Sequence, residues 1–420
     1  MRILFLTHYF PPETNAPANR VYELCRRWVK SGDEVHVITG VPNVPNGIVY
    51  AGYKNRLVQT EILDGIRTTR VWTFIAANKG KIRRILNYLS FWVSAGLAGL
   101  FVQKPDIVIA TSPQFFCGWA GVFTSRFRRV PLILEIRDLW PDSIAAVGAL
   151  RNERLIRMLR WLEGKMYAAA QEIVTVGEGY ERELIRKDVE AEKISIIHNG
   201  VDREIFYPRY TDEKIRQAYG LNHEFVCSYV GTIGMASGLD VVLRAAKLLK
   251  DQGRHEMRFL LVGAGAIADE LQQEAQRQAL DNIVFLGRQD RRLIPGILSI
   301  SDACLVHLKK AQIFETVLPS KIFEASAMAK PIILGVEGYA AALVRRANAG
   351  ICIEPENAEQ LFQAVVKLAE DPSLRQTLGQ DGREYVMKHH DRDVIAKNYQ
   401  NIMIRTCNRT RARHERTVKI

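Results

Sequence analysis

Apolar and polar residues alternate along the chain in a pattern of short buried strands separated by amphipathic helices. The first unit runs from Met1 to Thr39: an apolar strand, a loop, an amphipathic helix ending at Lys30, and a second strand. A comparable unit runs from Phe225 to Gly265, with a glycine-containing loop after its first strand. Because a helix between two strands usually joins them in parallel, each series predicts a parallel sheet covered on both faces.

Further strand patterns extend both series. They are DIVIATSP, PLILEIRD and EIVTVG in the first half, and NIVFLG, DACLVHL, PIILG and GICIEP in the second. A chain of 420 residues is too long for one ordinary core. We therefore expect an α/β protein with two doubly wound Rossmann-like domains, residues 1–200 and 219–385, facing each other across a cleft. Residues 201–218 have loop character and form the expected linker. Residues 386–405 are expected to be a helix that crosses back to the first domain, and 406–420 a basic tail.

The stretch LPSKIFEASAMAKPIILG, residues 318–335, predicts a helix with one carboxylate among small and apolar residues. Pro319 favours the first turn, where unpaired N–H groups near Ser320 and Lys321 suit a phosphate. Glu324 lies about 7 Å further along, at roughly 1.5 Å per residue. That distance fits the step from a diphosphate to the diol of its ribose. A core helix with one partly solvated glutamate is the alternative, and this stretch alone does not decide between them.

Ligands of open α/β sheets bind beyond the carboxyl ends of the strands, which directs attention to the residues there. Gly263-Ala-Gly265 resembles a dinucleotide fingerprint, but the next strand ends at Gly287 and continues with Arg288. A nicotinamide site needs an acidic residue at that place, so a dehydrogenase is disfavoured, and Arg288 suits a 2′-phosphate or a sugar diphosphate. No P-loop or metal-ligand spacing is present, and we expect no kinase, no metal and no cofactor.

The formal charge of +12 is unevenly distributed. Residues 54–84 carry eight Lys or Arg against two acidic residues, and residues 405–420 carry six against one. Such patches suit nucleic acid, an anionic membrane or phosphorylated substrates, although most are solvated surface. The tail has no interleaved aromatic residues, which disfavours nucleic acid. The six cysteines are scattered in apolar runs, as expected of buried thiols in a cytoplasmic protein. The apolar stretch at the start of the chain ends as early as His8, so we expect no secretory signal.

Residues 85–102 contain no charge and have the shortest length typical of a transmembrane helix. The strand pattern that follows directly favours packing on a sheet, and an interfacial docking helix is a third alternative. A second segment, LRNERLIRMLRWLEGK, places arginines 151, 154, 157 and 160 on one side of a helix and apolar residues on the other. Together these segments suit a lipid-linked acceptor at the inner leaflet, with ordinary helices packed on the sheet as the alternative.

Seven segments, in order along the chain, carry a resemblance. They are HYFPPETNAPANR, KPDIVIATSP, EIRDLWPDS, IIHNGVDREIFYP, YVGTIG, LLVGAG and PSKIFEASAMAKPII. With them the chain resembles a family 4 retaining glycosyltransferase of GT-B fold, in the bacterial surface-polysaccharide group of fucosamine-type and colanic-acid transferases. The resemblance implies metal-independent transfer of a hexosyl or aminosugar group in O-antigen, capsule or exopolysaccharide synthesis. The implied donor is a UDP- or GDP-sugar, and the implied acceptor is a polyprenyl-diphosphate-linked saccharide.

The resemblance and the strand ends together indicate site residues. The expected donor-binding residues are Gly231, Thr232, Gly234, Gly263, Gly265, Arg288, Lys309, Ser320, Lys321 and Glu324. The expected acceptor-binding residues are Glu13, Asn15, Asn19, Arg20, Arg137 and Asp138. Arg288 and Lys321 would stabilise charge on the departing diphosphate, and Asp138 would orient the acceptor or steady a positive sugar. Purely structural alternatives stay open: Asp138 pairs with Arg137 or caps a turn, and Glu13 pairs with Arg20.

The chain departs from the family pattern at three places. The first of the usual two glutamates would fall at Thr316, with Glu315 one position away. The loop over residues 232–238 has no cation, and Arg137 stands where relatives often have His, so no catalytic His is expected. These departures keep two alternatives open: a nucleotide-sugar epimerase of the same fold, and a non-catalytic subunit that binds a nucleotide sugar.

Overall fold

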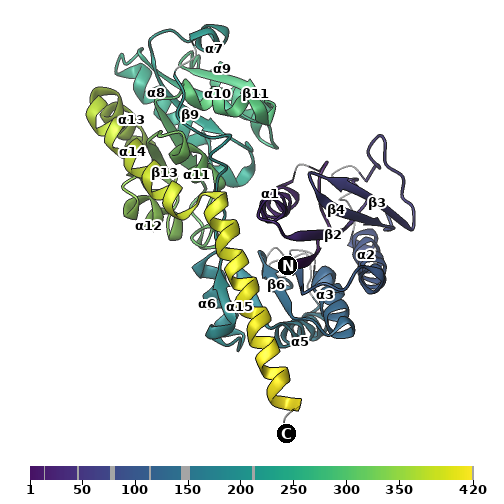
Figure 1. Cartoon of the computed structure of the whole chain (residues 1–420). Helices are drawn as coiled ribbons and strands as arrows, with labels where there is room; N and C mark the ends of the chain where they lie inside the picture. Colours follow the sequence, from purple (N-terminus) through teal and green to yellow (C-terminus); the bar gives the residue numbers. More distant parts are fainter. Residues whose placement is uncertain are drawn as a thin grey trace. The chain divides into compact units, whose positions relative to one another are not determined.

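The chain folds into two compact units, each with its own sheet (Figure 1). This computed structural model describes residues 1–13, 15–44, 47–75, 81–112, 115–142, 152–210 and 213–418. Unit 1 comprises Met1–His198 and Ile395–Ile420, and unit 2 comprises Asn199–Val394.

Unit 1 is built on an eight-stranded sheet of order β3-β4-β2-β1-β5-β6-β7-β8. The strands are β1 (Arg2–Leu6), β2 (Glu34–Gly40), β3 (Val58–Leu63), β4 (Ile66–Val71), β5 (Ile107–Thr111), β6 (Leu132–Ile136), β7 (Glu172–Thr175) and β8 (Ile194–Ile196). All neighbours pair in parallel except β3 and β4, which form an antiparallel hairpin at one edge. The central strands β5 and β6 are buried along their whole length because helices cover both faces.

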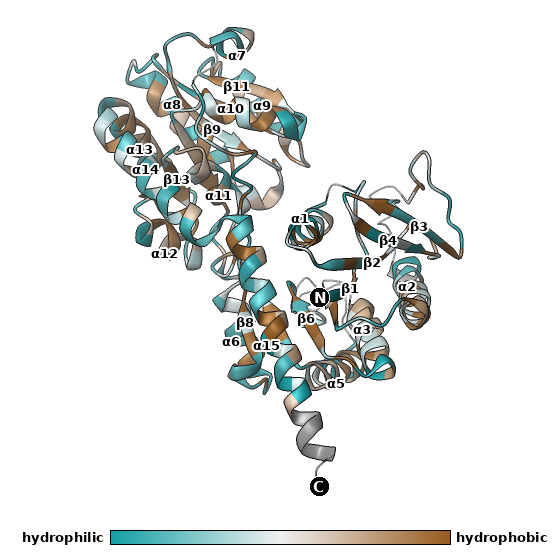
Figure 2. Cartoon of the chain, viewed as in Figure 1, coloured by the Kyte–Doolittle hydropathy of each residue, from teal (hydrophilic) through white to brown (hydrophobic). Residues whose placement is uncertain are grey.

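Helices α1 (Ala16–Lys30) and α15 (Arg392–Val418) pack on one face of this sheet. There the rings of Trp28 and Tyr399 lie 5.3 Å apart, and the Trp28 indole N–H donates to the Ala396 carbonyl at 3.0 Å. In Figure 2 α15 shows both brown and teal along its length, as expected of a helix with one buried side. The opposite face is covered by α2 (Lys81–Phe101), α3 (Phe115–Arg128), α5 (Glu153–Ala169) and α6 (Glu178–Arg186).

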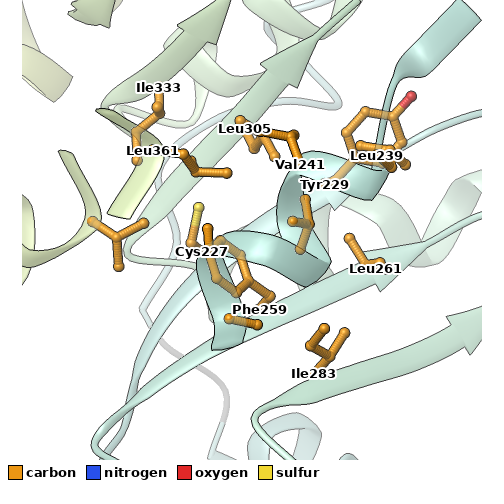
Figure 3. Close-up of a cluster of buried hydrophobic side chains, with 14 of the residues drawn as sticks. Cys227, Tyr229, Leu239, Val241, Phe259, Leu261, Ile283, Leu305, Ile333 and Leu361 are labelled. Atoms are coloured by element: carbon orange, nitrogen blue, oxygen red, sulfur yellow. The ribbon is translucent and has the colours of Figure 1, made fainter. Parts of the chain in front are cut away.

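Unit 2 is built on a six-stranded, wholly parallel sheet of order β11-β10-β9-β12-β13-β14. The strands are β9 (Phe225–Val230), β10 (Met257–Val262), β11 (Ile283–Gly287), β12 (Ala303–His307), β13 (Ile332–Gly335) and β14 (Gly350–Cys352). The helices are α7 (Glu213–Ala218), α8 (Asp240–Asp251), α9 (Ala268–Arg277), α10 (Ile294–Ser299), α11 (Ser320–Ala327), α12 (Tyr339–Arg346), α13 (Ala358–Glu370) and α14 (Pro372–His389). Figure 3 shows part of the core, where Phe259 of β10, Cys227 of β9 and Val241 of α8 are all buried.

The predicted fold class is confirmed, since both units are α/β with parallel sheets covered on both faces. The antiparallel β3–β4 hairpin is an addition that the sequence pattern did not indicate. Within the described ranges, no helix combines the length and the apolar character that crossing a bilayer requires.

Two segments differ in detail from the predicted boundaries. The stretch predicted as a linker over 201–218 contains the helix α7 and lies in unit 2. The helix predicted over 386–405 is the end of α14 and part of α15, which continues through most of the predicted tail. The two helices separate at Asp391, whose backbone bridges to Val201 and whose carboxylate accepts a hydrogen bond from the Asp393 N–H at 2.7 Å.

Candidate functional site

Glycines bring loop backbones into close contact at the carboxyl ends of β9 and β10. Gly231 and Gly263 both have φ of +147°, a region that side chains rarely adopt. A Cβ on Gly263 would lie 1.8 Å from the Gly231 carbonyl oxygen, and one on Gly265 would lie 2.2 Å from the Ile233 carbonyl oxygen. The Gly263 N–H donates to the Gly287 carbonyl at 2.8 Å, which ties β10 to the end of β11. The glycines therefore let the loops after β9 and β10 pack directly against each other at the carboxyl edge of the sheet.

The side chain of Lys321 reaches across to this edge from α11. Its Nζ donates to the Tyr229 hydroxyl at 3.1 Å and lies 4.5 Å from the centre of the Tyr229 ring. The Tyr229 hydroxyl in turn donates to the Thr232 carbonyl at 2.8 Å. A Cβ on Gly231 would lie 2.3 Å from Lys321 Cε, so only glycine leaves this path clear. An ammonium has three donors, and the described residues engage one of them by hydrogen bond.

The start of α11 offers backbone donors beside this ammonium. Pro319 occupies the position before the helix and supplies no side-chain hydrogen bond to the first turn. Ser320 is exposed, and the Ile322 N–H donates to the Pro319 carbonyl at 3.1 Å. An uncapped helix start next to a lysine is an arrangement that binds phosphate oxygens. Pro331 would allow the helix to continue to residue 330, but it ends at Ala327.

Glu324 lies on α11 one turn beyond Lys321 and is half-buried. Burial raises the pKa of its carboxyl, while the charges of Arg291, Arg392 and Lys321 act in the opposite direction. No hydrogen bond to its carboxylate is found within the part of the chain that the structure describes. Its two carboxylate oxygens can therefore accept hydrogen bonds from hydroxyl groups of a ligand.

Two of the other expected donor residues carry charge. Arg288 is exposed directly after Gly287, and Lys309 is exposed with its N–H donating to the Ala236 carbonyl at 2.9 Å. Arg291 was missed by sequence reasoning, although its spacing of three residues from Arg288 was a visible signal. Its positive charge opposes the rise in the pKa of the Glu324 carboxyl.

Thr232 and Gly234 complete the expected donor set. The side chain of Thr232 is exposed, and Gly234 has room for a methyl group, with its nearest neighbour 3.7 Å from an added Cβ. Glu315, the residue next to the expected glutamate position, has an exposed side chain, and its carbonyl accepts from the Tyr339 N–H at 2.9 Å.

Unit 1 contains a buried ion cluster at the carboxyl end of β6. The Arg20 Nε donates to Glu135 Oε1 at 2.5 Å, and Arg137 Nε lies 3.9 Å from the same oxygen. Glu135 has no exposed surface. Arg20 also donates to the carbonyls of Ile197 and His198 at 2.9 and 3.0 Å, which fixes the end of unit 1 after β8. Glu135 was missed by sequence reasoning, and the signal was a carboxylate inside an apolar strand.

This cluster corrects the structural alternative for Glu13, which does not pair with Arg20. Glu13 is buried, and its Oε1 accepts from the N–H groups of Asn43 and Val44 at 3.0 and 3.1 Å. Burial raises the pKa of its carboxyl, and these bonds act in the opposite direction. Glu13 therefore shapes the loop after β2.

Two asparagines lie at the start of α1. Asn15 caps the helix by accepting from the Ala18 N–H at 2.9 Å. The Asn19 N–H donates to the Asn15 carbonyl at 3.1 Å within the first turn.

The structure also corrects the suggested pairing of Asp138 with Arg137. The Arg137 guanidinium donates to the Ser112 carbonyl at 2.9 and 3.1 Å and approaches Glu135 instead. Burial lowers the pKa of Arg137. Asp138 is half-buried after β6, and its charge contributes to the raised pKa of Tyr167 and of Tyr180.

His8 lies buried at the carboxyl end of β1, and sequence reasoning gave it no role. Its ring contacts the edges or faces of Tyr9, Tyr88 and Phe91 at 4.7 to 5.6 Å. Burial lowers its pKa to about 4, so the ring is neutral at physiological pH. Two of these aromatic residues belong to α2, which therefore packs directly against the strand end.

Among the described residues, His, Cys, Asp and Glu side chains form no group of three or more with the spacing of a metal site.

Comparison with known protein families gives two adjoining matches that together cover most of the chain. Residues 15–200 match a family described as glycosyl transferase 4-like domain, and residues 211–385 match glycosyl transferases group 1.

Individual relatives agree with these matches along nearly the whole chain. The putative colanic acid biosynthesis glycosyl transferase WcaI of Escherichia coli is 24% identical over 426 residues, which cover 96% of this chain and 99% of the relative. Among solved structures, sucrose-phosphate synthase from Thermosynechococcus elongatus superposes with a TM-score of 0.71 at 18% identity, over 96% of this chain and 98% of that one. Anabaena Alr3699/HepE in complex with UDP-glucose gives a TM-score of 0.68 at 16% identity, over 96% and 99%. The likeness to these structures shows that the fold is GT-B.

Proposed function

Because the chain belongs to the glycosyltransferases that join a glycosyl transferase 4-like domain to a group 1 glycosyl transferase domain, we propose that it is a retaining, metal-independent transferase acting in bacterial surface-polysaccharide synthesis. It would move a hexosyl or aminosugar group from a UDP- or GDP-sugar to a lipid-linked saccharide. The relative named for colanic acid biosynthesis and the solved structure with UDP-glucose support this proposal.

The observation that carries the proposal is the arrangement of Lys321 and Glu324 on α11. The ammonium lies beside the glycine-lined strand ends and the uncapped helix start, where it can bind a diphosphate. The Glu324 carboxylate follows one turn later and can accept hydrogen bonds from the ribose hydroxyls. Arg288 and Lys309, both exposed, would add positive charge, in place of the cation that the loop over 232–238 lacks.

In the proposed reaction, the bond between the anomeric carbon and the β-phosphate oxygen breaks with its electron pair leaving on the diphosphate. The acceptor hydroxyl oxygen forms the new bond on the same face, and its proton passes to the departing phosphate. Lys321, Arg288 and the N–H groups of the α11 start would stabilise the negative charge that develops there.

On the acceptor side we propose a role for residues at the carboxyl edge of the unit 1 sheet. Asp138 would orient the acceptor hydroxyl, held by the loop that Arg137 anchors to Ser112. Arg20 would act as a positioning residue, since its side chain is fully engaged with Glu135 and two carbonyls. We propose that the reaction occurs on the cytoplasmic face of the inner membrane, in keeping with six free cysteines.

The test is a donor screen followed by product analysis. UDP- and GDP-sugars are first ranked by thermal shift, and the best donor is then incubated with a polyprenyl-diphosphate-linked saccharide in the presence of EDTA. The proposal predicts release of the nucleoside diphosphate and a product whose new linkage keeps the donor's anomeric configuration. Release of a free, epimerised nucleotide sugar would assign an epimerase instead, and donor binding with no turnover would assign a binding subunit.

A further inference from the structure

The outer side of the α2–α3–α5 helix layer in unit 1 carries an unusual combination of exposed apolar and basic side chains. These helices cover one face of the sheet with their inner sides. Their outer sides expose large apolar residues, which we call the docking face: Leu86, Val93 and Leu97 of α2, Phe127 of α3, and Met158 and Trp161 of α5. Large apolar side chains gathered on one exposed helix layer mark an interaction site more often than singly scattered ones do.

The apolar residues of α2 form a stripe rather than a scatter. Leu86, Val93 and Leu97 are spaced by seven and four residues, which places them on one side of the helix. Phe127 stacks on Phe123 with ring centroids 6.3 Å apart, and a Cβ on Gly96 would lie 3.3 Å from the Phe123 ring. The aromatic pair of α3 therefore packs against α2 at Gly96, the residue before Leu97, and the two helices lie side by side (Figure 1).

The charges around the docking face are almost all positive. Neither α2 nor α3 contains a single Asp or Glu. Arg83, Arg126, Arg154 and Arg157 are exposed, and no salt bridge to any of them is found among the described residues. In α5 the buried Glu163 is neutralised by Lys187 at 2.8 Å, which leaves Glu153 as its one exposed carboxylate.

The positive charge around the docking face distinguishes between two partners that could cover it: a second copy of the chain and an anionic bilayer. In a two-fold pairing with a second copy, the same patch meets itself, and like charges would oppose one another. An anionic bilayer instead accepts Trp, Phe and Leu side chains at its interface and attracts the flanking arginines. We propose that the docking face binds the surface of an anionic lipid bilayer.

The docking face also connects to the edge of the sheet proposed for the acceptor. Because β4 ends at that edge, α2 begins there and runs back toward the start of β5. The inner side of α2 contacts His8, at the end of β1, through Tyr88 and Phe91. A saccharide carried on a membrane lipid would thus arrive beside this edge. Membrane docking in this role rests on the proposed function, with the anionic bilayer as the partner.

The test is co-sedimentation of the full chain with vesicles of phosphatidylcholine, with and without phosphatidylglycerol. We expect binding to the phosphatidylglycerol vesicles and its weakening by salt. The double variant Leu97→Ser/Trp161→Ser should bind at least about tenfold less, because two large apolar side chains no longer enter the interface. The matched control is Ile404→Ser on α15, since Ile404 (46% exposed) and Leu97 (50%) are equally accessible but cover opposite faces of the sheet.

The fluorescence of Trp161, which is 62% exposed, reports whether the docking face contacts the lipid. Brominated lipids should quench its fluorescence, and Trp161→Phe should lose that quenching. Absence of vesicle binding, or equal loss with Ile404→Ser, would overturn the inference, as would concentration-dependent dimers abolished by Leu97→Ser. Donor binding is measured on the same samples by thermal shift without lipid. If the wild-type chain binds donor but not vesicles, the docking face alone is refuted. If it binds vesicles but no donor, the proposed function is refuted.

Discussion

The ammonium of Lys321 lies over the ring of Tyr229, 4.5 Å from its centre, and donates to its hydroxyl at 3.1 Å. The two residues are far apart in sequence, and their contact joins the start of α11 to the end of β9. It holds a positive charge at the glycine-lined edge of the unit 2 sheet while leaving donors of the ammonium available.

Replacing Lys321 by Met should weaken binding of the donor with little change in fold stability. A charge-assisted hydrogen bond contributes about 1.5–3 kcal/mol, which corresponds to a loss of affinity of about 10- to 150-fold. Titration calorimetry with a nucleoside diphosphate measures the loss directly.

Two further variants separate the charge from its surroundings. Tyr229→Phe keeps the ring under the ammonium and removes only the hydroxyl, so we expect a smaller effect on affinity. Lys310→Met removes an exposed lysine 3.9 Å from Glu337 and should leave affinity unchanged. An equal loss of affinity in Lys310→Met and Lys321→Met would show that only net charge matters.

Donor affinity should depend on pH through Glu324. Burial raises the pKa of this carboxyl. If the ionised form binds the ribose, affinity falls as the pH decreases through that raised pKa, and Glu324→Gln shows lower affinity without this decline. A 2′-deoxyribose donor should bind the wild type less well than the ribose donor, and Glu324→Gln should lose most of that preference. Affinities for the two donors, measured over a pH series, check both expectations.

The same raised pKa has the opposite consequence for stability. The folded chain holds the Glu324 proton more tightly than the unfolded chain, so stability falls as the pH rises from the unfolded pKa through the raised one. Glu324→Gln lacks this decline, and its Tm at neutral pH should equal or exceed that of the wild type. A lower Tm together with unchanged donor affinity would make Glu324 a structural residue.

Gly263→Ala should destabilise unit 2 and reduce donor binding. Its φ of +147° costs a side chain about 1–3 kcal/mol, and the added methyl would also meet the Gly231 carbonyl. Gly234→Ala is the control for stability, because Gly234 has an extended backbone and open space around its Cβ position. Thermal unfolding of both variants provides the measurement, and equal Tm values would contradict the close approach of the two loops.

Glu135→Gln should lower the stability of unit 1 by about 3–5 kcal/mol, because it leaves the Arg20 guanidinium buried without its anion. Glu183→Gln on α6 breaks an exposed pair with Arg186 and should cost less than about 1 kcal/mol. Urea unfolding of the two variants compares these losses. Similar losses would mean that the buried pair contributes no more than a surface pair.

Local patterns predicted the strands and most helices well, because burial on both sheet faces leaves a strong signal in the sequence. The helix α1 ends at Lys30 as expected, and Lys321 and Glu324 lie on one helix after Pro319. The uncapped start of α11 was also foreseeable from its composition. Local patterns therefore indicated the part of the candidate site proposed to bind the donor.

Contacts between distant segments were not predictable in the same way. Arg20 was considered as a partner of Glu13, seven residues away, but it pairs with Glu135, which is 115 residues away. The glycines at 263 and 265 suggested a dinucleotide fingerprint, whereas each faces a carbonyl of the loop after β9. The uncharged run over residues 85–102 predicted a helix, but only the neighbours of α2 determine which of its apolar residues stay exposed.

Hydrogen exchange at the first turn of α11 tests the central claim most directly. Backbone amides of residues 320–322 are followed in the full chain with and without a UDP- or GDP-sugar that binds in the thermal-shift screen. We predict that exchange of the Ser320 and Lys321 amides slows when the donor is bound, because they donate to its phosphates. Donor binding that leaves these amides unchanged and protects another part of the chain would contradict the account.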